Sequence, residues 1–469
     1  MPVFWSKTNC EGIGLARGIQ STGSQLFTRR RAGQNDPVLN LPDLRPTPHL
    51  GFSRHHPKPH ALRQRFRTLL YLICVLTDCS TFIVTFTVTR RLAEEGASPL
   101  SLGLLGAGFS FAAAVASIAS GLAALRWGAA VPFLAGIGTL LLSILGCREL
   151  PPQSTGFLAA YVSLGLGLGG LYPPLIGWLN QGEPSGAAER SGVSGRLILF
   201  CIAWNLGIMA GQLTGGALFA QGPPVALGVA LLLAIANLGL ALWASRQSLR
   251  LPHVPQTPLA AVGDHQRAAA FQKLSWLANL GGMFGGSLVL HLISDLAVSI
   301  GIAAERQGEV MALWRVVIIA TYLLMHFASG WQFRMLPSVV SQIFGALGLV
   351  VISQAQSPLS LLAGLALLGQ LVGYNYFSGL FYSASGNPAQ NRALTAAIHE
   401  ATLAAGMAVG TTVGGALGNL AGHRVPYLLG AVVVTGVLAG QGMGWRRWVR
   451  PLERESGDGS ERTRRPADQ

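Results

Sequence analysis

Four ionisable side chains lie inside long apolar stretches of this chain, where a charge is unfavourable. Asp78 lies midway along a stretch at 67–89, and Arg315 lies about seven residues into a stretch at 308–328. Glu400, preceded by His399, lies early in a stretch at 394–417. A charged side chain in hydrocarbon costs about 2.5–3.5 kcal/mol on insertion scales, so such groups face a bundle interior or water. We therefore take all four as candidates for binding a substrate or a coupling ion.

Each of these groups has a structural interpretation beside the functional one. Asp78 either binds a proton or cation in a central cavity, or anchors helix packing through Thr77, Thr81 or a neighbouring backbone group. Arg315 either binds an anionic substrate or forms an ion pair with Asp78 or Glu400. Glu400 is either a second proton site or the partner of a loop arginine.

Uncharged polar and aromatic side chains form a second set of candidates. Tyr172 lies in a stretch at 156–179, Asn205 in one at 196–219, and Tyr374 and Asn375 in one at 357–384. Hydroxyl, amide and ring groups at this depth suit a small-molecule solute that presents similar groups.

His291 and Asp295 are four residues apart in a stretch at 274–297, so both lie on one face of a helix near its outer end. They form a pair that titrates near neutral pH, or they extend separately to the membrane surface; we favour the second arrangement.

Motifs of soluble enzymes are missing from the sequence. It contains no GxxxxGK[ST], GxSxG or HExxH pattern, and its five cysteines form no CxxC pair. GLGLGG at 165–170 lies inside an apolar stretch with no preceding strand, so it is not a dinucleotide-binding loop. We expect no catalytic residue, no metal site and no cofactor.

The elements that must position these residues are membrane-spanning helices. Half of the residues are hydrophobic and only 11% are charged, against about 25% in soluble domains. A stretch of about 20 apolar residues crosses a bilayer as one helix. The sequence predicts an all-α membrane protein with about twelve such helices, at 67–89, 99–123, 129–147, 156–179, 196–219, 223–244, 274–297, 308–328, 337–354, 357–384, 394–417 and 425–444.

The net charge of +14 is concentrated in three segments outside the predicted helices. Residues 1–67 hold 11 basic and 3 acidic side chains, residues 246–273 hold 4 and 1, and residues 446–469 hold 7 and 5. Twelve helices place all three segments on one side, which the positive-inside rule makes cytoplasmic. We therefore expect a protein of the cell (inner) membrane with both termini cytoplasmic, and no binding to nucleic acid.

These segments also divide the chain. We expect a disordered basic tail at 1–66, a six-helix bundle at 67–245, a cytoplasmic linker at 246–272, a second six-helix bundle at 273–445 and a disordered polar tail at 446–469. Residues 1–66 lack the apolar core of a secretory signal. A transit peptide and a wrongly assigned start are the alternatives for this segment.

A glycine pattern occurs once in each predicted bundle, as GIMAGQLTGG and GMAVGTTVGG. Small residues four apart let a second helix approach closely, and we expect these faces to pack against the opposite half. Tyr172 and Gly177 recur as Tyr374 and Gly379, which indicates two similar halves; chance similarity among glycine-rich helices is the alternative. The glycines are Gly207, Gly211, Gly215 and Gly216 in the first copy and Gly406, Gly410, Gly414 and Gly415 in the second.

Residues 67–445 resemble the major facilitator superfamily. GIMAGQLTGG is similar to its fifth-helix motif gxxxGPxxGG, with Gln212 in place of proline. GLAALRWGAA is similar to its loop motif GxLaDRxGRK: Gly121, Arg126 and Gly128 match, while Leu125 replaces the acidic residue. In the family, the charged residues of this motif hold the two halves together. Most of these charges are missing here, so the resemblance does not carry over this interaction.

The resemblance implies a monomeric secondary active transporter that moves a small solute through the lipid bilayer by alternating access, coupled to a proton or another cation. Within such a transporter, the positions of the ionisable residues lead us to expect Asp78 as the leading coupling site and Glu400 as the second. We expect Arg315 to set the charge of the cavity. A non-transporting membrane sensor or scaffold and a multi-pass membrane enzyme are the alternatives.

Overall fold

The described part of the chain is almost entirely helical. The computed structural model describes residues 59–152, 154–179, 187–249, 251, 262–385 and 392–454, and no strand occurs among them. The helices are α1 (Pro59–Glu94), α2 (Pro99–Trp127), α3 (Ala130–Glu149), α4 (Thr155–Leu179), α5 (Ala187–Phe219), α6 (Pro223–Ser248), α7 (Val262–Ser287), α8 (Ile293–Ser299), α9 (Ala304–Phe327), α10 (Leu336–Ser353), α11 (Pro358–Ser385), α12 (Arg392–Ala421) and α13 (Val425–Trp448). A π-helical turn, η1 (Leu288–Leu292), joins α7 to α8, and a short 3₁₀ turn, η2 (Ser329–Trp331), precedes α10.

Among the described residues, twelve helical spans are long and apolar enough to cross a membrane, with α7, η1 and α8 forming one continuous span at Gln266–Ser299. Large apolar side chains are exposed on their flanks, including Leu232 and Val432 at 68% each. Apolar surface on this scale suits contact with lipid tails rather than water. The prediction of an all-α protein with about twelve transmembrane helices is confirmed.

Several helices extend beyond the apolar stretches that predicted them. Residues 59–66 belong to α1, although the sequence assigned them to a tail. The predicted linker loses residues at both ends, because α6 runs to Ser248 and α7 begins at Val262. A helix continues once its polar residues reach the membrane surface, where water satisfies them, so hydropathy underestimates its length. Residues 1–58 and 455–469, with most of the predicted tails, lie outside the described part.

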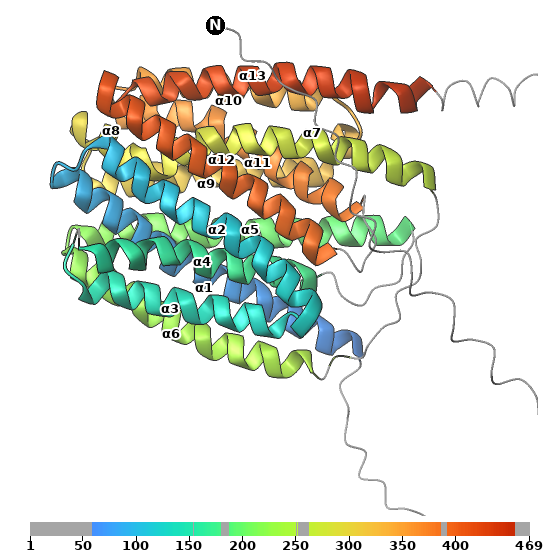
Figure 1. The fold of residues 1–469 in the computed structure, drawn as a ribbon, viewed down its shortest axis with the longest axis horizontal. Helices are drawn as coiled ribbons and strands as arrows, with labels where there is room; N and C mark the ends of the chain where they lie inside the picture. The colour runs from blue at the N-terminus through green and yellow to red at the C-terminus, as the bar shows by residue number, and fades with distance from the viewer. Residues whose placement is uncertain are drawn as a thin grey trace, which may run out of the picture. The chain divides into compact units, whose positions relative to one another are not determined.

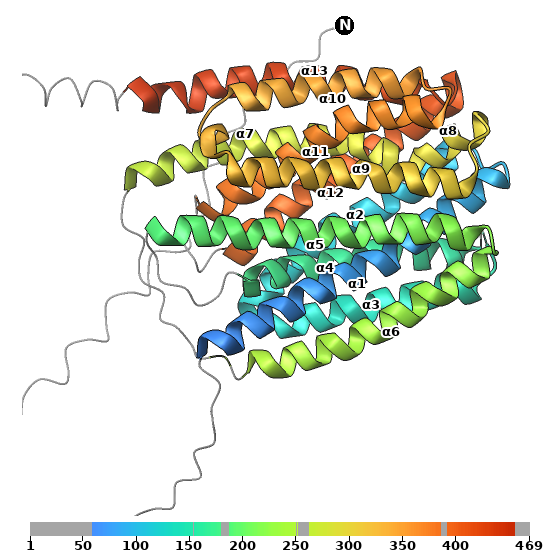
Figure 2. The same cartoon turned by 180° about the vertical axis from the view of Figure 1, so that it is seen from behind.

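The spans form two groups that run side by side (Figures 1 and 2). Figure 1 shows α1–α6 in its lower part and α7–α13 in its upper part, with all helices roughly along one direction. We call the end where α1 begins and α13 ends the tail end. We call the opposite end the hairpin end; it holds the short connections at 95–98, 220–222, 300–303, 354–357 and 422–424.

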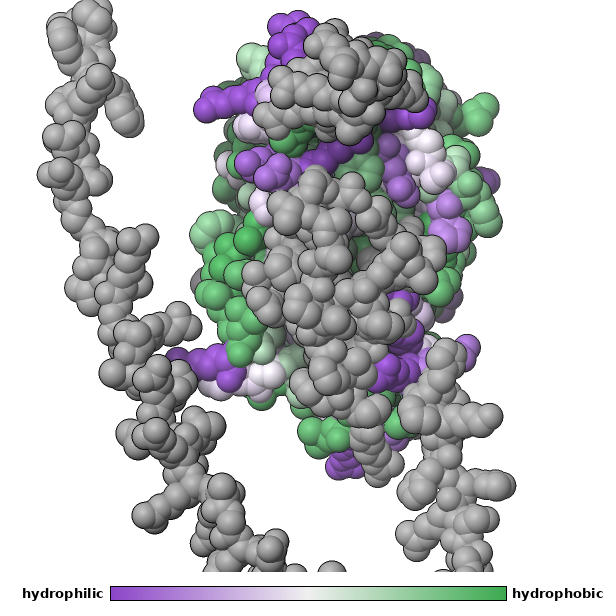
Figure 3. All heavy atoms as spheres, turned by 90° about the vertical axis from the view of Figure 1, so that its right-hand side faces the viewer, coloured by the Kyte–Doolittle hydropathy of each residue, from purple (hydrophilic) through white to green (hydrophobic). Residues whose placement is uncertain are grey.

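The tail end carries hydrophilic side chains among its described residues. Seen from this end, purple residues lie at several places on the face while hydrophobic residues line much of its margin (Figure 3). Polar ends and apolar flanks are the pattern expected of a bundle that crosses a bilayer.

The two glycine patterns occupy equivalent places in the two groups, but most of the glycines pack within their own half. A methyl group added to Gly211 would lie 2.6 Å from the Cys79 carbonyl oxygen of α1, and one added to Gly410 would lie 2.5 Å from the Phe284 carbonyl oxygen of α7. Gly207 and Gly215 likewise face α1, and Gly406 and Gly414 face α7 and η1. The expectation that these faces pack against the opposite half is therefore wrong for these six residues.

Only the last glycine of each pattern reaches the other half. An added methyl group on Gly216 would lie 3.0 Å from Cα of Gly308 in α9, and one on Gly415 would lie 2.8 Å from Cα of Gly103 in α2. These glycines let α5 approach α9 and α12 approach α2 backbone to backbone. Both contacts lie toward the hairpin end.

Candidate functional site

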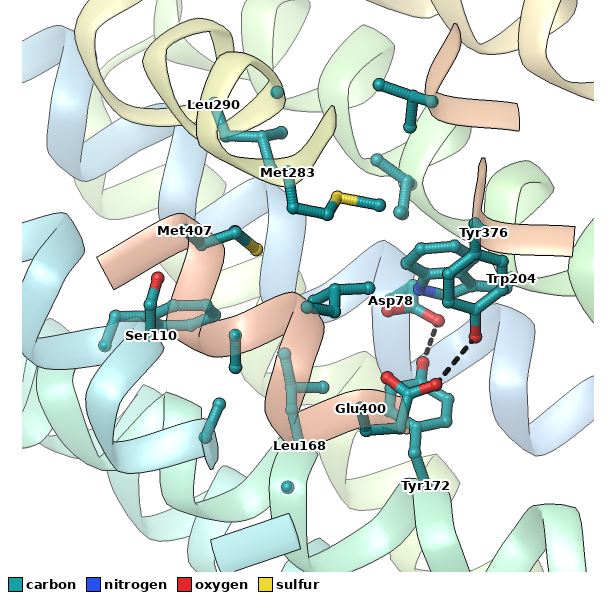
Figure 4. A pocket seen from close by; sticks show the side chains of 18 of the residues that line it. Asp78, Ser110, Leu168, Tyr172, Trp204, Met283, Leu290, Tyr376, Glu400 and Met407 are labelled. Carbon is teal, nitrogen blue, oxygen red and sulfur yellow. Dashed lines mark hydrogen bonds between the residues drawn. The ribbon is translucent and has the colours of Figure 1, made fainter. Parts of the chain in front are cut away.

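A cavity of about 80 Å³ lies between the two groups of helices, near the middle of their length. Its walls come from both groups and are mostly apolar, with a few polar side chains among them (Figure 4). The polar and aromatic lining residues are Asp78, Phe82, Phe109, Ser110, Ser117, Tyr172, Trp204, Trp314, Arg315, Tyr376 and Glu400. An apolar pocket with a few convergent polar groups is the usual form of a small-molecule site.

Asp78 on α1 is fully buried and held by a tyrosine from α4. The Tyr172 hydroxyl donates a hydrogen bond to Asp78 Oδ2, and Cys74 Sγ donates to the same oxygen at 3.7 Å. Asp78 Oδ1 has no hydrogen-bond partner in the described structure. Thr77 does not contact this carboxyl group; its hydroxyl accepts from Asn237 Nδ2 at 2.8 Å. The side chain therefore has one oxygen free to take a proton or a ligand.

The glycine face of α5 explains how α1 is held at this point. An added methyl group on Gly207 would lie 2.8 Å from Cβ of Asp78 and 2.5 Å from the Val75 carbonyl oxygen. Without side chains on this face, α5 lies directly against the α1 backbone. The predicted glycine motif thus fixes the position of the predicted acid.

Glu400 on α12 has a matching arrangement in the other half. The Tyr376 hydroxyl on α11 donates to Glu400 Oε1 at 2.9 Å, and both side chains are buried (Figure 4). The alternative that Glu400 pairs with a loop arginine is not realised among the described residues. Trp204 of α5 lies against Tyr376 with ring centroids 4.5 Å apart, so this wall joins the two halves.

Arg315 on α9 is 2% exposed and forms no ion pair with a described carboxylate. Its Nη1 donates to Asn205 Oδ1 at 3.4 Å, and its guanidinium carbon lies 4.2 Å from the centroid of the Trp314 ring. Asn205 in turn donates to the Tyr322 hydroxyl at 3.3 Å. The expected alternative of an ion pair with Asp78 or Glu400 is therefore not formed in this structure.

Four predicted site residues do not line the cavity. Asn205 is one of them, and it contacts the cavity residue Arg315. Asn375 lies in the core of its own half, where its Nδ2 donates to the Ala278 carbonyl oxygen at 2.9 Å. Tyr374 packs against Trp331, with ring centroids 6.1 Å apart. His399 is fully buried behind Tyr376, with its ring against Gly379 and no partner for either nitrogen among the described residues.

The interpretation of His291 and Asp295 is wrong in both of its forms. His291 is 1% exposed and packs on α2, with its ring centroid 5.6 Å from that of Phe109. Asp295 pairs with His423 instead, at 2.5 Å between Oδ2 and Nδ1. The π-helical turn contains His291 and changes the angle between the two positions, so the four-residue spacing of an α-helix does not apply.

The loop-motif residues lie away from the cavity, at the tail end of α2. Gly128 ends the helix with φ of 80°, a conformation that residues with a side chain rarely adopt. Arg126 is exposed and lies over the Trp127 ring, 5.7 Å from its centroid. Gly121 is buried.

A polar cluster that links the halves near the hairpin end is not predicted by the sequence. Arg90 is 5% exposed and donates to Gln307 Oε1 at 2.8 Å, and Gln307 Nε2 donates to Ser294 Oγ at 2.9 Å. Thr89 and Ser294 hydroxyls are 3.1 Å apart. In the sequence, Arg90-Arg91 and Glu94-Glu95 look like balanced charges of a surface loop. In the structure α1 continues to Glu94, and Arg90 is buried within this extension.

No family model matches the sequence, and no curated protein matches it. Solved structures do match. The human organic anion transporter MFSD10 (TETRAN) is 15% identical with a TM-score of 0.62, over 81% of this chain and 99% of that one. A bacterial homolog of the human lysosomal transporter Spinster, inward-facing and unoccupied, is 14% identical with a TM-score of 0.62, over 83% and 98%. The nucleoside transporter NupG is 15% identical with a TM-score of 0.56, over 81% and 100%. Together with the twelve spans in two groups of six, these likenesses establish that the chain has the fold of the major facilitator superfamily.

Proposed function

We propose that this protein is a secondary active transporter that moves a small solute across the membrane by alternating access. One observation carries the proposal: the central cavity places ionisable groups from both halves, Asp78, Arg315 and Glu400, on an otherwise apolar wall. Ionisable groups at this depth are unfavourable unless they serve a pathway or pair with one another. Arg315 pairs with neither acid here, which favours a pathway.

The two halves contact each other at the hairpin end, which supports a state in which the cavity is closed on that side. These contacts are weak enough for the halves to separate there. Close helix contact is provided by Gly103 against Gly415 and by Gly216 against Gly308. Among the described residues the polar contacts at this end are few, with Arg90 and Gln307 at their centre. Because a net protein hydrogen bond contributes only about 0.5–1.5 kcal/mol, a ligand that binds the two states differently could shift such an interface.

For coupling, we propose that Asp78 carries the proton or cation, with Glu400 as a second site. Each carboxyl group accepts one hydrogen bond from a tyrosine hydroxyl, Tyr172 or Tyr376. Neither contacts a cationic side chain within the described residues, so each depends on a proton or a guest cation for neutralisation. The charge excess of the tail segments supports a cytoplasmic tail end.

A sensor or scaffold with the same fold is the second candidate, favoured by Leu125 in place of the acidic residue of the loop motif. A multi-pass membrane enzyme is the remaining alternative.

Solute uptake into sealed proteoliposomes tests the proposal. We expect uptake that a proton or sodium gradient drives above equilibrium and that an uncoupler abolishes. Binding without passage would favour the sensor, and chemical conversion of the bound compound would favour the enzyme.

A further inference from the structure

Two nitrogens of the Arg315 guanidinium group donate to no described protein group. Nη1 is engaged by Asn205, but Nε and Nη2 have no partner, although the side chain is 2% exposed and lines the cavity. Nε–H and one terminal N–H project from the same edge of the planar guanidinium group. This edge is the fork that receives both oxygens of a carboxylate.

The orientation of this fork is fixed by its neighbours. The guanidinium carbon lies 4.2 Å from the Trp314 ring centroid and 6.0 Å from the ring centroid of Phe82 in α1. Asn205, which holds Nη1, is itself held by the Cys201 carbonyl oxygen at 3.0 Å and by Tyr322. A donor pair that is already oriented loses little entropy when a ligand binds.

No carboxylate in the described part of the chain pairs with this fork. Asp78 and Glu400 line the same cavity, yet each is bonded to a tyrosine and lies beyond ion-pair distance of Arg315. A buried charge without a partner is strongly unfavourable. A guest with an anionic head would remove that penalty.

The remaining wall of the cavity indicates that the rest of the bound ligand is apolar. Apolar side chains from both halves form most of the wall, among them Phe109, Leu168, Met283, Leu403 and Met407. Such a wall accepts an aliphatic or aromatic group.

We propose that the cavity binds a small organic monocarboxylate, with both carboxylate oxygens on Nε and Nη2 of Arg315 and the apolar body against this wall. The proposal rests on the transport function proposed above and names its substrate class. In it, the free Oδ1 of Asp78 takes the coupling proton rather than a cationic group of the substrate.

Thermal stability and equilibrium binding of the purified full chain in detergent test this assignment without requiring transport. The probes are butyrate, hexanoate, benzoate and phenylacetate, each compared with its amide, with the primary ammonium compound of the same body and with its 2-amino acid where one exists. We expect at least one carboxylate to raise the melting temperature while its amide and ammonium counterparts do not.

Variants of Arg315 assign the effect to the fork. Arg315→Gln should raise the Kd of that carboxylate about 100-fold or more, because two charge-assisted hydrogen bonds are lost. Arg315→Lys keeps the charge without the fork and should raise it about 10-fold. Arg306→Gln, on the same helix but 62% exposed, is the matched control and should change nothing. If Arg315→Gln does not fold, the comparison of Arg315→Lys with Arg306→Gln decides.

Three results would overturn the assignment: no carboxylate stabilises the protein, Arg315→Lys binds as tightly as the wild type, or an ammonium compound or amino acid binds more tightly than the matching carboxylate. Failure of the transport function looks different. In that case the carboxylate binds through Arg315 but does not enter proteoliposomes. If instead another solute is taken up and no carboxylate binds, the carboxylate assignment is refuted and the transport function is not.

Discussion

Adding one methyl group at the close contacts between the halves should open the hairpin end. Alanine at 103 would place Cβ 2.4 Å from the Thr411 carbonyl oxygen and 2.7 Å from Cα of Gly415. Alanine at 308 would place it 2.7 Å from the Gln212 carbonyl oxygen. Carbon atoms pack at about 3.5–4.0 Å, so α2 and α12, or α5 and α9, must separate by roughly 1 Å.

The added methyl group overpacks the contact between the halves, and overpacking typically destabilises a packed structure by about 1–3 kcal/mol. If only the state closed at the hairpin end is affected, its population relative to the open state falls about 5-fold to 140-fold, since 1.4 kcal/mol is a factor of ten. Met311, which lines a small void between the halves near the hairpin end, is a suitable reporter.

Labelling of Met311→Cys in a background without native cysteines measures this population. A membrane-impermeant maleimide on the hairpin side of sealed vesicles should react faster when Gly103→Ala or Gly308→Ala is present. Gly239→Ala on α6 is the matched control, because an added methyl group there meets nothing within 4 Å. Equal labelling rates in Gly103→Ala, Gly308→Ala and Gly239→Ala would refute the reasoning.

Three further predictions follow from the site and the packing. Asp78→Asn should abolish gradient-driven accumulation, with at most a few-fold change in the Kd of a cavity ligand, as measured by paired uptake and binding; uphill accumulation that persists would remove Asp78 from coupling. Gly211→Leu and Gly410→Leu should destabilise the protein by more than about 3 kcal/mol, because they press on α1 and α7 within one half; the melting temperature checks this, and a wild-type value would contradict it. A cysteine at 256 should be labelled from the cytoplasmic side of the membrane only, given the charge excess of that segment; labelling from outside would reverse the orientation.

The sequence predicts the twelve spans well because a bilayer requires long apolar helices, and it finds Asp78, Arg315 and Glu400 because charges are rare in such helices. It does not predict their partners. Tyr172 is 94 residues from Asp78, and Asn205 is 110 residues from Arg315, so these contacts depend on how the helices rotate and pack.

Helix rotation also explains why Tyr376 lines the cavity and Tyr374 does not. Two residues apart on a helix is a rotation of about 200°, so only one of them can face the centre. The repeat in the sequence aligns Tyr172 with Tyr374, whereas the structure gives Tyr376 the corresponding role beside Glu400. In a membrane helix both faces are apolar, so hydropathy does not distinguish them.

The glycine patterns likewise predict close approach without naming the neighbour. Small residues permit contact with any helix, and the structure assigns six of the eight glycines to the neighbouring helix of the same half. His291 was misplaced for a local reason, since nothing in the sequence marks the π-helical turn that moves it away from Asp295.

Uphill accumulation of a cavity ligand is the measurement that tests the central claim most directly. The ligand is first identified by thermal stabilisation that Arg315→Lys weakens, and its uptake is then followed in sealed proteoliposomes under an imposed proton or sodium gradient. We predict accumulation above the equilibrium concentration in the wild type, and none in Asp78→Asn or after addition of an uncoupler. A ligand that binds in the cavity but never crosses the membrane under any gradient would contradict the account.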